Sequence, residues 1–268
     1  MSFELIIVGG GRMGSALAEG LLSAQWCAAE QLAIVESALE QREVLAERFA
    51  GVTILAGLEL ADVSPTTGVV LCVKPDYAET VARMIGACGA TRLLSVVAGL
   101  STARLEAAFS SPVAVVRSMP NTPVLVRHGV SAIAGGSSVT AADLDWAESI
   151  LGAVGTVVRV SERNLDAVTG LSGSGPAYFY LVVESLIEAG VHQGLSRDVS
   201  RQLVLGTFAG SAALLSASGE SPEELRAQVT SPGGTTAAGL RALEGRAVRA
   251  AFLDAVSAAA ERSRQLGR

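Results

Sequence analysis

Short apolar runs alternate with amphipathic segments over the first 160 residues of the chain. Runs rich in valine, isoleucine and leucine are typical of strands that are buried on both faces of a sheet. The predicted strands are residues 5–8, 32–35, 52–55, 69–73, 93–97, 113–116, 130–134 and 156–160. Helical spacing between them predicts helices over residues 13–24, 41–49, 77–85, 102–109 and 141–151. This alternation predicts an α/β fold with an open, mostly parallel, doubly wound sheet.

The pattern changes after Val160, where strands give way to helical periodicity that lasts to the end of the chain. Helices are predicted over residues 177–189, 196–217, 222–229, 236–243 and 246–266. Their faces are too apolar to stand alone, so we expect a second subunit to cover them; a compact bundle within one chain is the alternative. We predict an α/β domain at residues 1–162 and an all-α dimerisation domain at residues 163–268.

A glycine-rich turn follows the first predicted strand. Gly9, Gly11 and Gly14 have the G-x-G-x-x-G spacing between a predicted strand and a predicted helix. In that context the first glycine makes the tight turn, the second lets a pyrophosphate approach the backbone, and the third allows the helix to pack closely on the strand. The phosphates then lie at the helix N-terminus. We predict a Rossmann-type dinucleotide site here, against the alternative of a tight turn without a ligand.

An acidic residue ends the second predicted strand. Glu36 stands where a Rossmann fold places the acid that binds the adenosine ribose of NAD. A 2′-phosphate at that place would meet a like charge unless a neighbour compensates it. Ser37 can hydrogen-bond either group, and Arg12 is a candidate cation from the glycine turn. A solvated strand end is the equally weighted alternative for Glu36.

Other predicted strands end in segments that suit the same edge of the sheet, where open α/β folds bind their ligands. These segments are Lys74-Pro75, Ala98-Gly99 and the turn-rich loop at residues 117–123. Lys74 is the only lysine in the chain, which restricts where a catalytic lysine can be. A plain solvated charge is the alternative for this residue.

The strongest candidate for substrate chemistry is residues 231–236, which read Ser-Pro-Gly-Gly-Thr-Thr. Pro232 suits a helix entry, and the two glycines after it let the backbone come close to a ligand. Free N–H groups at such a helix start attract a carboxylate or a phosphate. Thr235 and Thr236 add hydroxyls that donate or accept hydrogen bonds. A capped helix start without a ligand is the alternative.

Composition narrows the class of protein. A formal charge of −6 argues against a broadly basic nucleic-acid surface. The two histidines, His128 and His192, are too few and too isolated for a zinc site, so we expect no metal. The odd number of cysteines without CxxC spacing suggests buried thiols in a reducing compartment. With no signal peptide and no long apolar segment, we expect a cytoplasmic protein without a membrane partner.

With these residues in view, the whole chain closely resembles the pyrroline-5-carboxylate reductase family. The matching segments are Gly9–Gly14, Val73–Pro75, Ala98-Gly99, Met119–Pro123, Gly170–Tyr178 and Ser231–Thr236, of which the last two are specific to that family. The resemblance implies NAD(P)H-dependent reduction of the cyclic imine 1-pyrroline-5-carboxylate to L-proline, the last step of proline biosynthesis. It also implies a homodimer intertwined through the helical domain and often assembled into a larger ring.

The resemblance and the motifs together give a set of expected site residues. The cofactor, NADPH or NADH, would contact Val8, Gly9, Gly10, Gly11, Arg12, Met13, Gly14, Glu36, Ser37, Cys72, Val73, Lys74, Pro75, Val96, Val97, Ala98 and Asn121. The substrate would contact Ser231, Gly233, Gly234, Thr235, Thr236 and Glu162. Arg12 replaces the usual small polar residue of the family, Leu58 stands where the family often has an asparagine that binds the ribose, and Gln228 replaces an asparagine on the substrate side.

These residues suit the reduction of an imine. A hydride attacks the C=N carbon, and Thr236 is the candidate donor to the nitrogen, while amides at residues 233–236 suit the substrate carboxylate. A β-hydroxyacid dehydrogenase would need a lysine in the long interdomain helix, and the chain has none after Lys74. A broader imine reductase remains an alternative, as does a non-catalytic regulator that senses nucleotides.

Overall fold

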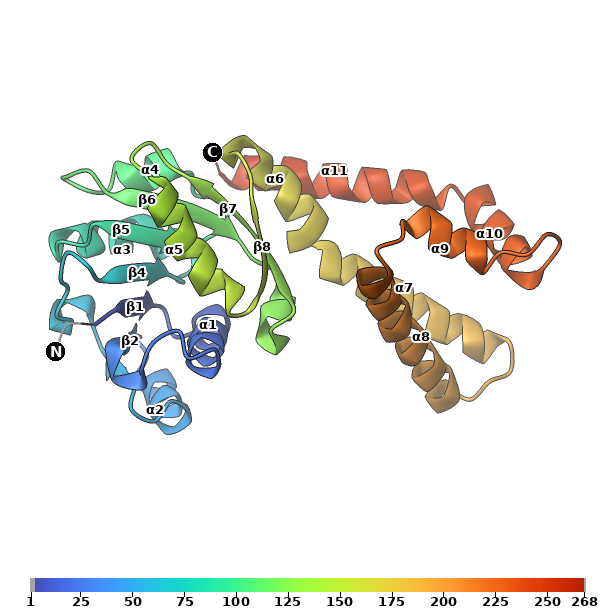
Figure 1. Ribbon diagram of the computed structural model, residues 1–268, viewed down its shortest axis with the longest axis horizontal. Coiled ribbons are helices and arrows are strands. Elements are labelled where there is room, and N and C mark those ends of the chain that lie inside the picture. Colours follow the sequence, from blue (N-terminus) through green and yellow to red (C-terminus); the bar gives the residue numbers. More distant parts are fainter. Residues whose placement is uncertain (1–2, 268) are drawn as a thin grey trace. The chain divides into compact units, whose positions relative to one another are not determined.

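The computed structural model describes residues 3–267, and its first part is built on one eight-stranded sheet (Figure 1). The strand order is β3-β2-β1-β4-β5-β6-β7-β8, and every neighbouring pair is parallel except β6 and β7. The strands are β1 (Leu5–Val8), β2 (Leu32–Val35), β3 (Thr53–Leu55), β4 (Gly68–Leu71), β5 (Arg92–Ser95), β6 (Ala114–Met119), β7 (Gly129–Gly135) and β8 (Gly155–Arg159). The predicted α/β class and its mostly parallel sheet are confirmed.

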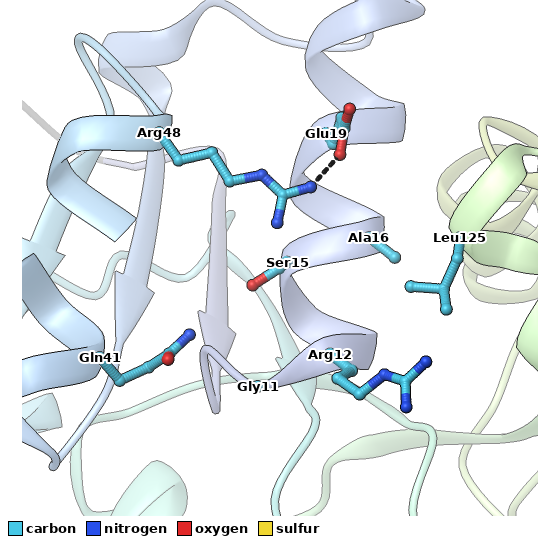
Figure 2. A pocket seen from close by; sticks show the side chains of 8 residues that line it. All are labelled: Gly11, Arg12, Ser15, Ala16, Glu19, Gln41, Arg48 and Leu125. Carbon is cyan, nitrogen blue, oxygen red and sulfur yellow. Dashed lines mark hydrogen bonds and ion pairs between the residues drawn. The ribbon is translucent and has the colours of Figure 1, made fainter. Parts of the chain in front are cut away.

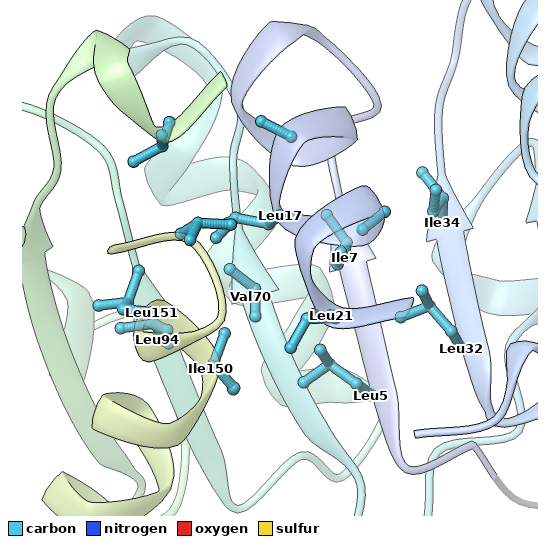
Figure 3. Close-up of a cluster of buried hydrophobic side chains, with 14 of the residues drawn as sticks. Leu5, Ile7, Leu17, Leu21, Leu32, Ile34, Val70, Leu94, Ile150 and Leu151 are labelled. Atoms are coloured by element: carbon cyan, nitrogen blue, oxygen red, sulfur yellow. The ribbon is translucent and has the colours of Figure 1, made fainter. Parts of the chain in front are cut away.

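Helices cover both faces of the sheet because its central strands are apolar on both sides. One core cluster joins α1 (Arg12–Ser23), α2 (Leu39–Arg48) and α5 (Ala141–Gly152) to one face (Figure 3). The other cluster joins α3 (Pro75–Ala87) and α4 (Thr102–Glu106) to the opposite face. Successive residues of β1 divide between them: Leu5 and Ile7 point into the first cluster, Ile6 and Val8 into the second.

One helix of this part is shorter than its sequence pattern predicts. The pattern favours a helix over residues 102–109, but α4 ends at Glu106. Beyond that point the N–H groups of Ala108 and Phe109 bond to carbonyls three residues back, at Leu105 and Glu106. The chain therefore tightens into 3-10 turns before the following Ser-Ser-Pro segment, which cannot continue a helix.

Short 3-10 segments complete the first part of the chain. They are η1 (Ala29–Gln31), η2 (Leu58–Leu60), η3 (Thr122–Val126) and η4 (Glu162–Asn164). Helix α6 (Leu165–Val168) then runs into a π-helical turn, η5 (Thr169–Gly173), in which Ser174 N–H bonds to Thr169 O at 2.8 Å. Such turns are rare and frequently lie at functional sites.

The remaining elements are helical, as the pattern predicts. They are α7 (Gly175–His192), α8 (Arg197–Ser218), α9 (Pro222–Gln228), α10 (Thr235–Gly245) and α11 (Val248–Leu266). Many large apolar side chains on α7 and α8 are exposed in the single chain, among them Phe179, Tyr180 and Leu203. Since exposed apolar area of this kind marks an interface, α7 and α8 have the surfaces of a subunit contact.

By its contacts the chain divides into two compact units. The first runs to Ser174 and includes the chain from Ala258 onward; the second is Gly175–Ser257. The end of α11 is fastened within the first unit, where Ser263 Oγ donates to Asp166 Oδ1 at 2.6 Å. These limits differ from the expected division after residue 162, and that domain boundary stays a prediction.

A membrane-spanning helix needs about 20 mostly apolar residues. Within residues 3–267 no single helix has the length and hydropathy of such a span. The pair α8 and α9 meets the criterion together, by length and composition only, and it is bent by 119° at the break between them.

Candidate functional site

The glycine turn after β1 has the geometry of a phosphate-binding loop. Gly9 has φ +107°, and a Cβ there would lie 2.6 Å from the carbonyl oxygen of Cys72. A Cβ at Gly14 would collide with the carbonyl oxygen of Gly9, so α1 can pack this closely only with glycine. By contrast, a Cβ at Gly11 would meet nothing within 4 Å. The space beside Gly11, the N-cap of α1, is therefore open to a ligand, which fits a pyrophosphate at the helix start.

Glu36 lies directly beyond β2 and is bonded to this turn. Its Oε2 accepts the backbone N–H of Gly10 at 3.0 Å, and its Oε1 accepts the backbone N–H of Ala38 at 3.0 Å. The hydroxyl of Ser37 lies 3.5 Å from the same Oε1. The structure thus brings Glu36 and Ser37 to the glycine turn, where an adenosine ribose would lie in a Rossmann fold.

Two residues at the start of α2, Gln41 and Arg42, complete this corner and were not among the expected site residues. Gln41 Nε2 donates to Gly10 O at 2.8 Å. Arg42 Nη1 donates to the carbonyls of Glu36 at 3.0 Å and Ser37 at 2.7 Å. The one sequence signal for a role of these two residues is their position, in the first turns of the helix that follows Glu36.

A cavity of about 300 Å³ opens beside Gly11 between α1, α2 and η3 (Figure 2). Arg12 lines it on the side of Leu125, and Gln41 lies on the other side of Gly11 in this view. Arg48 and Glu19, which also line the cavity, form an ion pair. Arg12 therefore stands at the glycine turn as expected, but it points away from the corner that holds Gln41.

The loops after β4 and β5 lie at the same edge of the sheet as the glycine turn, because β4 is the neighbour of β1. Cys72 N–H bonds to Val8 O at 2.8 Å, and α3 begins at Pro75 with Lys74 as its N-cap. Val96 N–H bonds to Leu71 O at 3.1 Å. Cys72 and Val73 thus lie against the glycine turn, where a Cβ on Gly9 would be 2.6 Å from Cys72 O and 3.1 Å from Val73 N.

Two of the expected cofactor residues in these loops have restricted side chains. Val97 is only 3% exposed and packs in the core, so its backbone alone can face a ligand. Burial raises the pKa of the Cys72 thiol to about 12, so the thiol is protonated at neutral pH. A protonated thiol is a weak nucleophile, so Cys72 is not expected to act as one at neutral pH.

Glu162 forms a partly buried cluster with two residues that the sequence analysis did not single out as site residues. Its Oε1 accepts the N–H of Thr102 at 2.6 Å, and its Oε2 accepts the Thr102 hydroxyl at 2.7 Å. Arg117, which is buried, lies 3.3 Å from Oε1 through Nη1. The carboxylate thus accepts a free N–H group in the first turn of α4 and also neutralises a buried guanidinium. No spacing in the sequence links these three positions.

The Asn121 side chain fixes the loop that follows β6. Its Oδ1 accepts the N–H of Val130 at 2.9 Å, and its Nδ2 donates to the carbonyl of Ser172 in η5 at 3.2 Å. One amide proton of Nδ2 is left for a further acceptor. Asn121 therefore holds η5 against the β6–β7 connection.

The segment 231–236 belongs to the second unit and opens α10. Gly233 has φ +70°, and the N–H of Gly234 bonds to Ser231 O at 3.0 Å, which makes a tight turn before the helix. Gly234 is the N-cap, so Thr235 and Thr236 form the first turn with N–H groups that lack helical partners. Both threonines are exposed. The predicted helix entry is present and accessible.

Among residues 3–267 no three His, Cys, Asp or Glu side chains gather closely enough to hold a metal ion.

The chain was compared with protein-family models and with known proteins. Residues 162–266 match the family model for pyrroline-5-carboxylate reductase dimerisation, and residues 4–99 match that for coenzyme F420-dependent NADP oxidoreductases. A pyrroline-5-carboxylate reductase of Corynebacterium melassecola is 39% identical over 98% of both chains.

Two solved structures of the same family have similar folds. The pyrroline-5-carboxylate reductase of Coxiella burnetii has a TM-score of 0.91 at 31% identity over 100% of both chains. A Plasmodium falciparum pyrroline carboxylate reductase, solved with NADP bound, has a TM-score of 0.85 at 34% identity over 99% of this chain and 98% of its own. The chain described here belongs to the pyrroline-5-carboxylate reductase family.

Proposed function

We propose that this protein reduces 1-pyrroline-5-carboxylate to L-proline, the last step of proline biosynthesis, with NADPH or NADH as the reductant. The observation that carries the proposal is the glycine turn: Gly9 and Gly14 leave no room for a side chain, while the space beside Gly11 is open. This geometry fits a dinucleotide pyrophosphate. Membership of the reductase family over the full chain supports the substrate and the reaction.

The first unit binds and orients the cofactor. A bound NADPH or NADH supplies the hydride. The backbone from Val8 to Gly14 receives the pyrophosphate at the N-terminus of α1, with Arg12 and Met13 as its first helical residues. Glu36 and Ser37 meet the adenosine ribose. The loops at residues 72–75 and 96–98, with Asn121, form the rest of the wall.

The second unit supplies the substrate loop. The imine nitrogen gains electron density as the hydride arrives, and in this proposal the exposed hydroxyl of Thr236 donates to it. The free N–H groups at the start of α10 suit the substrate carboxylate, with Ser231, Gly233, Gly234 and Thr235 around them. Glu162 borders the same site in this proposal.

The assembly and location follow from the same proposal. The exposed apolar side chains of α7 and α8, with the match to a dimerisation family, support a homodimer that can join others in a ring. The three cysteines are free, which suits the reducing cytoplasm. The negative net charge argues against a nucleic-acid partner, and no membrane partner is proposed.

A comparison of substrates tests the proposal. Purified protein is given NADH or NADPH with 1-pyrroline-5-carboxylate, with 1-pyrroline, which lacks the carboxylate, or with a β-keto acid. We expect rapid turnover of the first compound only, because the start of α10 binds the carboxylate. Equal turnover of 1-pyrroline would indicate a broader imine reductase, and reduction of the keto acid alone would indicate a β-hydroxyacid dehydrogenase. Cofactor binding without any turnover would indicate a nucleotide-sensing regulator.

A further inference from the structure

We propose that Glu36 makes this protein select NADH over NADPH. The inference rests on the proposed function, since it names which reductant the dinucleotide site accepts. It is drawn from three features of the corner beside the glycine turn. The Glu36 carboxylate is fixed, the Arg42 guanidinium is hydrogen-bonded to backbone carbonyls, and the Arg12 side chain points away from this corner.

The Glu36 carboxylate is fixed at both oxygens. Oε2 accepts from Gly10 N–H and Oε1 accepts from Ala38 N–H, each at 3.0 Å. Swinging the side chain aside for a phosphate would break both bonds and leave Gly10, a buried residue, without its acceptor. The negative charge therefore stays at the end of β2 when a dinucleotide arrives.

No arginine or lysine among residues 3–267 forms an ion pair with the Glu36 carboxylate. Arg42 Nη1 is directed at the carbonyls of Glu36 and Ser37, at 3.0 and 2.7 Å. Arg12 lies on the side of Leu125 in the neighbouring cavity, across Gly11 from Gln41 (Figure 2). Arg48, in the same cavity, is paired with Glu19. The partners of the Glu36 carboxylate are instead the backbone N–H groups of Gly10 and Ala38.

A ribose and a phosphorylated ribose meet this corner differently. A carboxylate has about four lone-pair sites, so Oε2 of Glu36 can still accept a hydroxyl proton besides the Gly10 N–H. The 2′-hydroxyl of NADH is such a donor. The 2′-phosphate of NADPH carries negative charge and has little to donate, so it meets repulsion at the same place.

Equilibrium binding tests the inference without turnover. The probes are ADP-ribose and 2′-phospho-ADP-ribose, titrated by calorimetry into the full-length protein, because they differ only in the phosphate. We expect ADP-ribose to bind more tightly by about tenfold or more. Added salt should reduce the difference in affinity between the two probes, because it screens the repulsion. Tighter binding of the 2′-phospho probe would overturn the inference, as would a gap that salt widens.

Two variants separate the local charge from the general charge of the protein. Glu36→Gln keeps the size of the side chain and should narrow the gap by about tenfold. Glu40→Gln removes the same charge from an exposed position in the first turn of α2 and should leave the gap unchanged. Equal effects of the two variants would contradict the role of Glu36. If Glu36→Gln does not fold, the difference in affinity between the two probes for the wild type, and its salt dependence, still test the inference. Failure of both probes to bind would instead reject the dinucleotide site itself.

Discussion

Gly14 stands so close to Gly9 that a Cβ on Gly14 would collide with the carbonyl oxygen of Gly9. The contact joins the first turn of α1 to the end of β1, and Ile7 packs against the same position. It sets how near the helix N-terminus comes to the sheet edge, and so where a pyrophosphate can lie.

This contact predicts different effects for two glycines of one motif. Gly14→Ala should destabilise the protein by about 1–3 kcal/mol, because helix and strand must separate. Gly11→Ala should change stability by less than about 0.5 kcal/mol, since its Cβ meets open space, yet it should weaken ADP-ribose binding by occupying that space. Urea unfolding and calorimetry measure both effects. Equal stability losses in the two variants would contradict the described geometry.

Thr236 gives a second prediction. If its hydroxyl donates to the imine nitrogen, Thr236→Ala should lower kcat for imine reduction by about 100-fold while NADH binding stays normal. Thr236→Ser keeps the donor and should retain much of the rate, and Thr235→Ala is a matched loss of the neighbouring hydroxyl. Small and equal effects of Thr236→Ala and Thr236→Ser would assign the proton to water or to the substrate.

The third prediction is that two subunits share each active site. The glycine turn and the segment 231–236 belong to different compact units. Chains carrying Gly11→Trp cannot bind the cofactor, and chains carrying Thr236→Ala lack the donor, so each homodimer is inactive. In a mixed dimer with shared sites, both lesions fall in one site and the other is whole. Co-refolding equal amounts should recover about a quarter of wild-type activity, because half the dimers are mixed. No recovery, with mixed dimers shown to form, would reject shared sites.

The buried thiol of Cys72 predicts a loss of stability at alkaline pH. Burial raises its pKa from 9.0 to about 12. The unfolded chain therefore loses this proton first, so the contribution of Cys72 is present below pH 9 and declines as the pH rises toward 12. Relative to Cys72→Ala, the wild type should lose about 1 kcal/mol of unfolding free energy between pH 8 and pH 10. A constant difference across this range would mean that the thiol titrates as an exposed group.

The sheet could be predicted because each strand is an apolar run bounded by turn residues. Leu5–Val8 is buried at every position, which is why four successive apolar residues suffice to identify it. The glycine spacing likewise has one local cause, the approach of α1 to β1. The end of α4 was not predictable in this way, because it depends on 3-10 bonds at Ala108 and Phe109 rather than on periodicity.

Candidate site residues could be predicted only where their signal lies within one short stretch of sequence. Glu36 could be identified because it follows β2 directly, but its bond to Gly10 spans 26 residues and required the fold. Thr102 and Arg117 were missed as partners of Glu162 because they lie 60 and 45 residues away in the sequence. The π-helical turn Thr169–Gly173 was also missed, since the same residues would fit an ordinary helix entry.

The most direct test of the central claim is the stoichiometry of one reaction. Purified protein is mixed with a limiting amount of NADH and an excess of 1-pyrroline-5-carboxylate, and both NADH oxidation and L-proline are measured. The account predicts one molecule of L-proline for each NADH oxidised, with no oxidation when the imine is omitted. NADH that binds but is not oxidised by the imine, or is oxidised without forming proline, would contradict it.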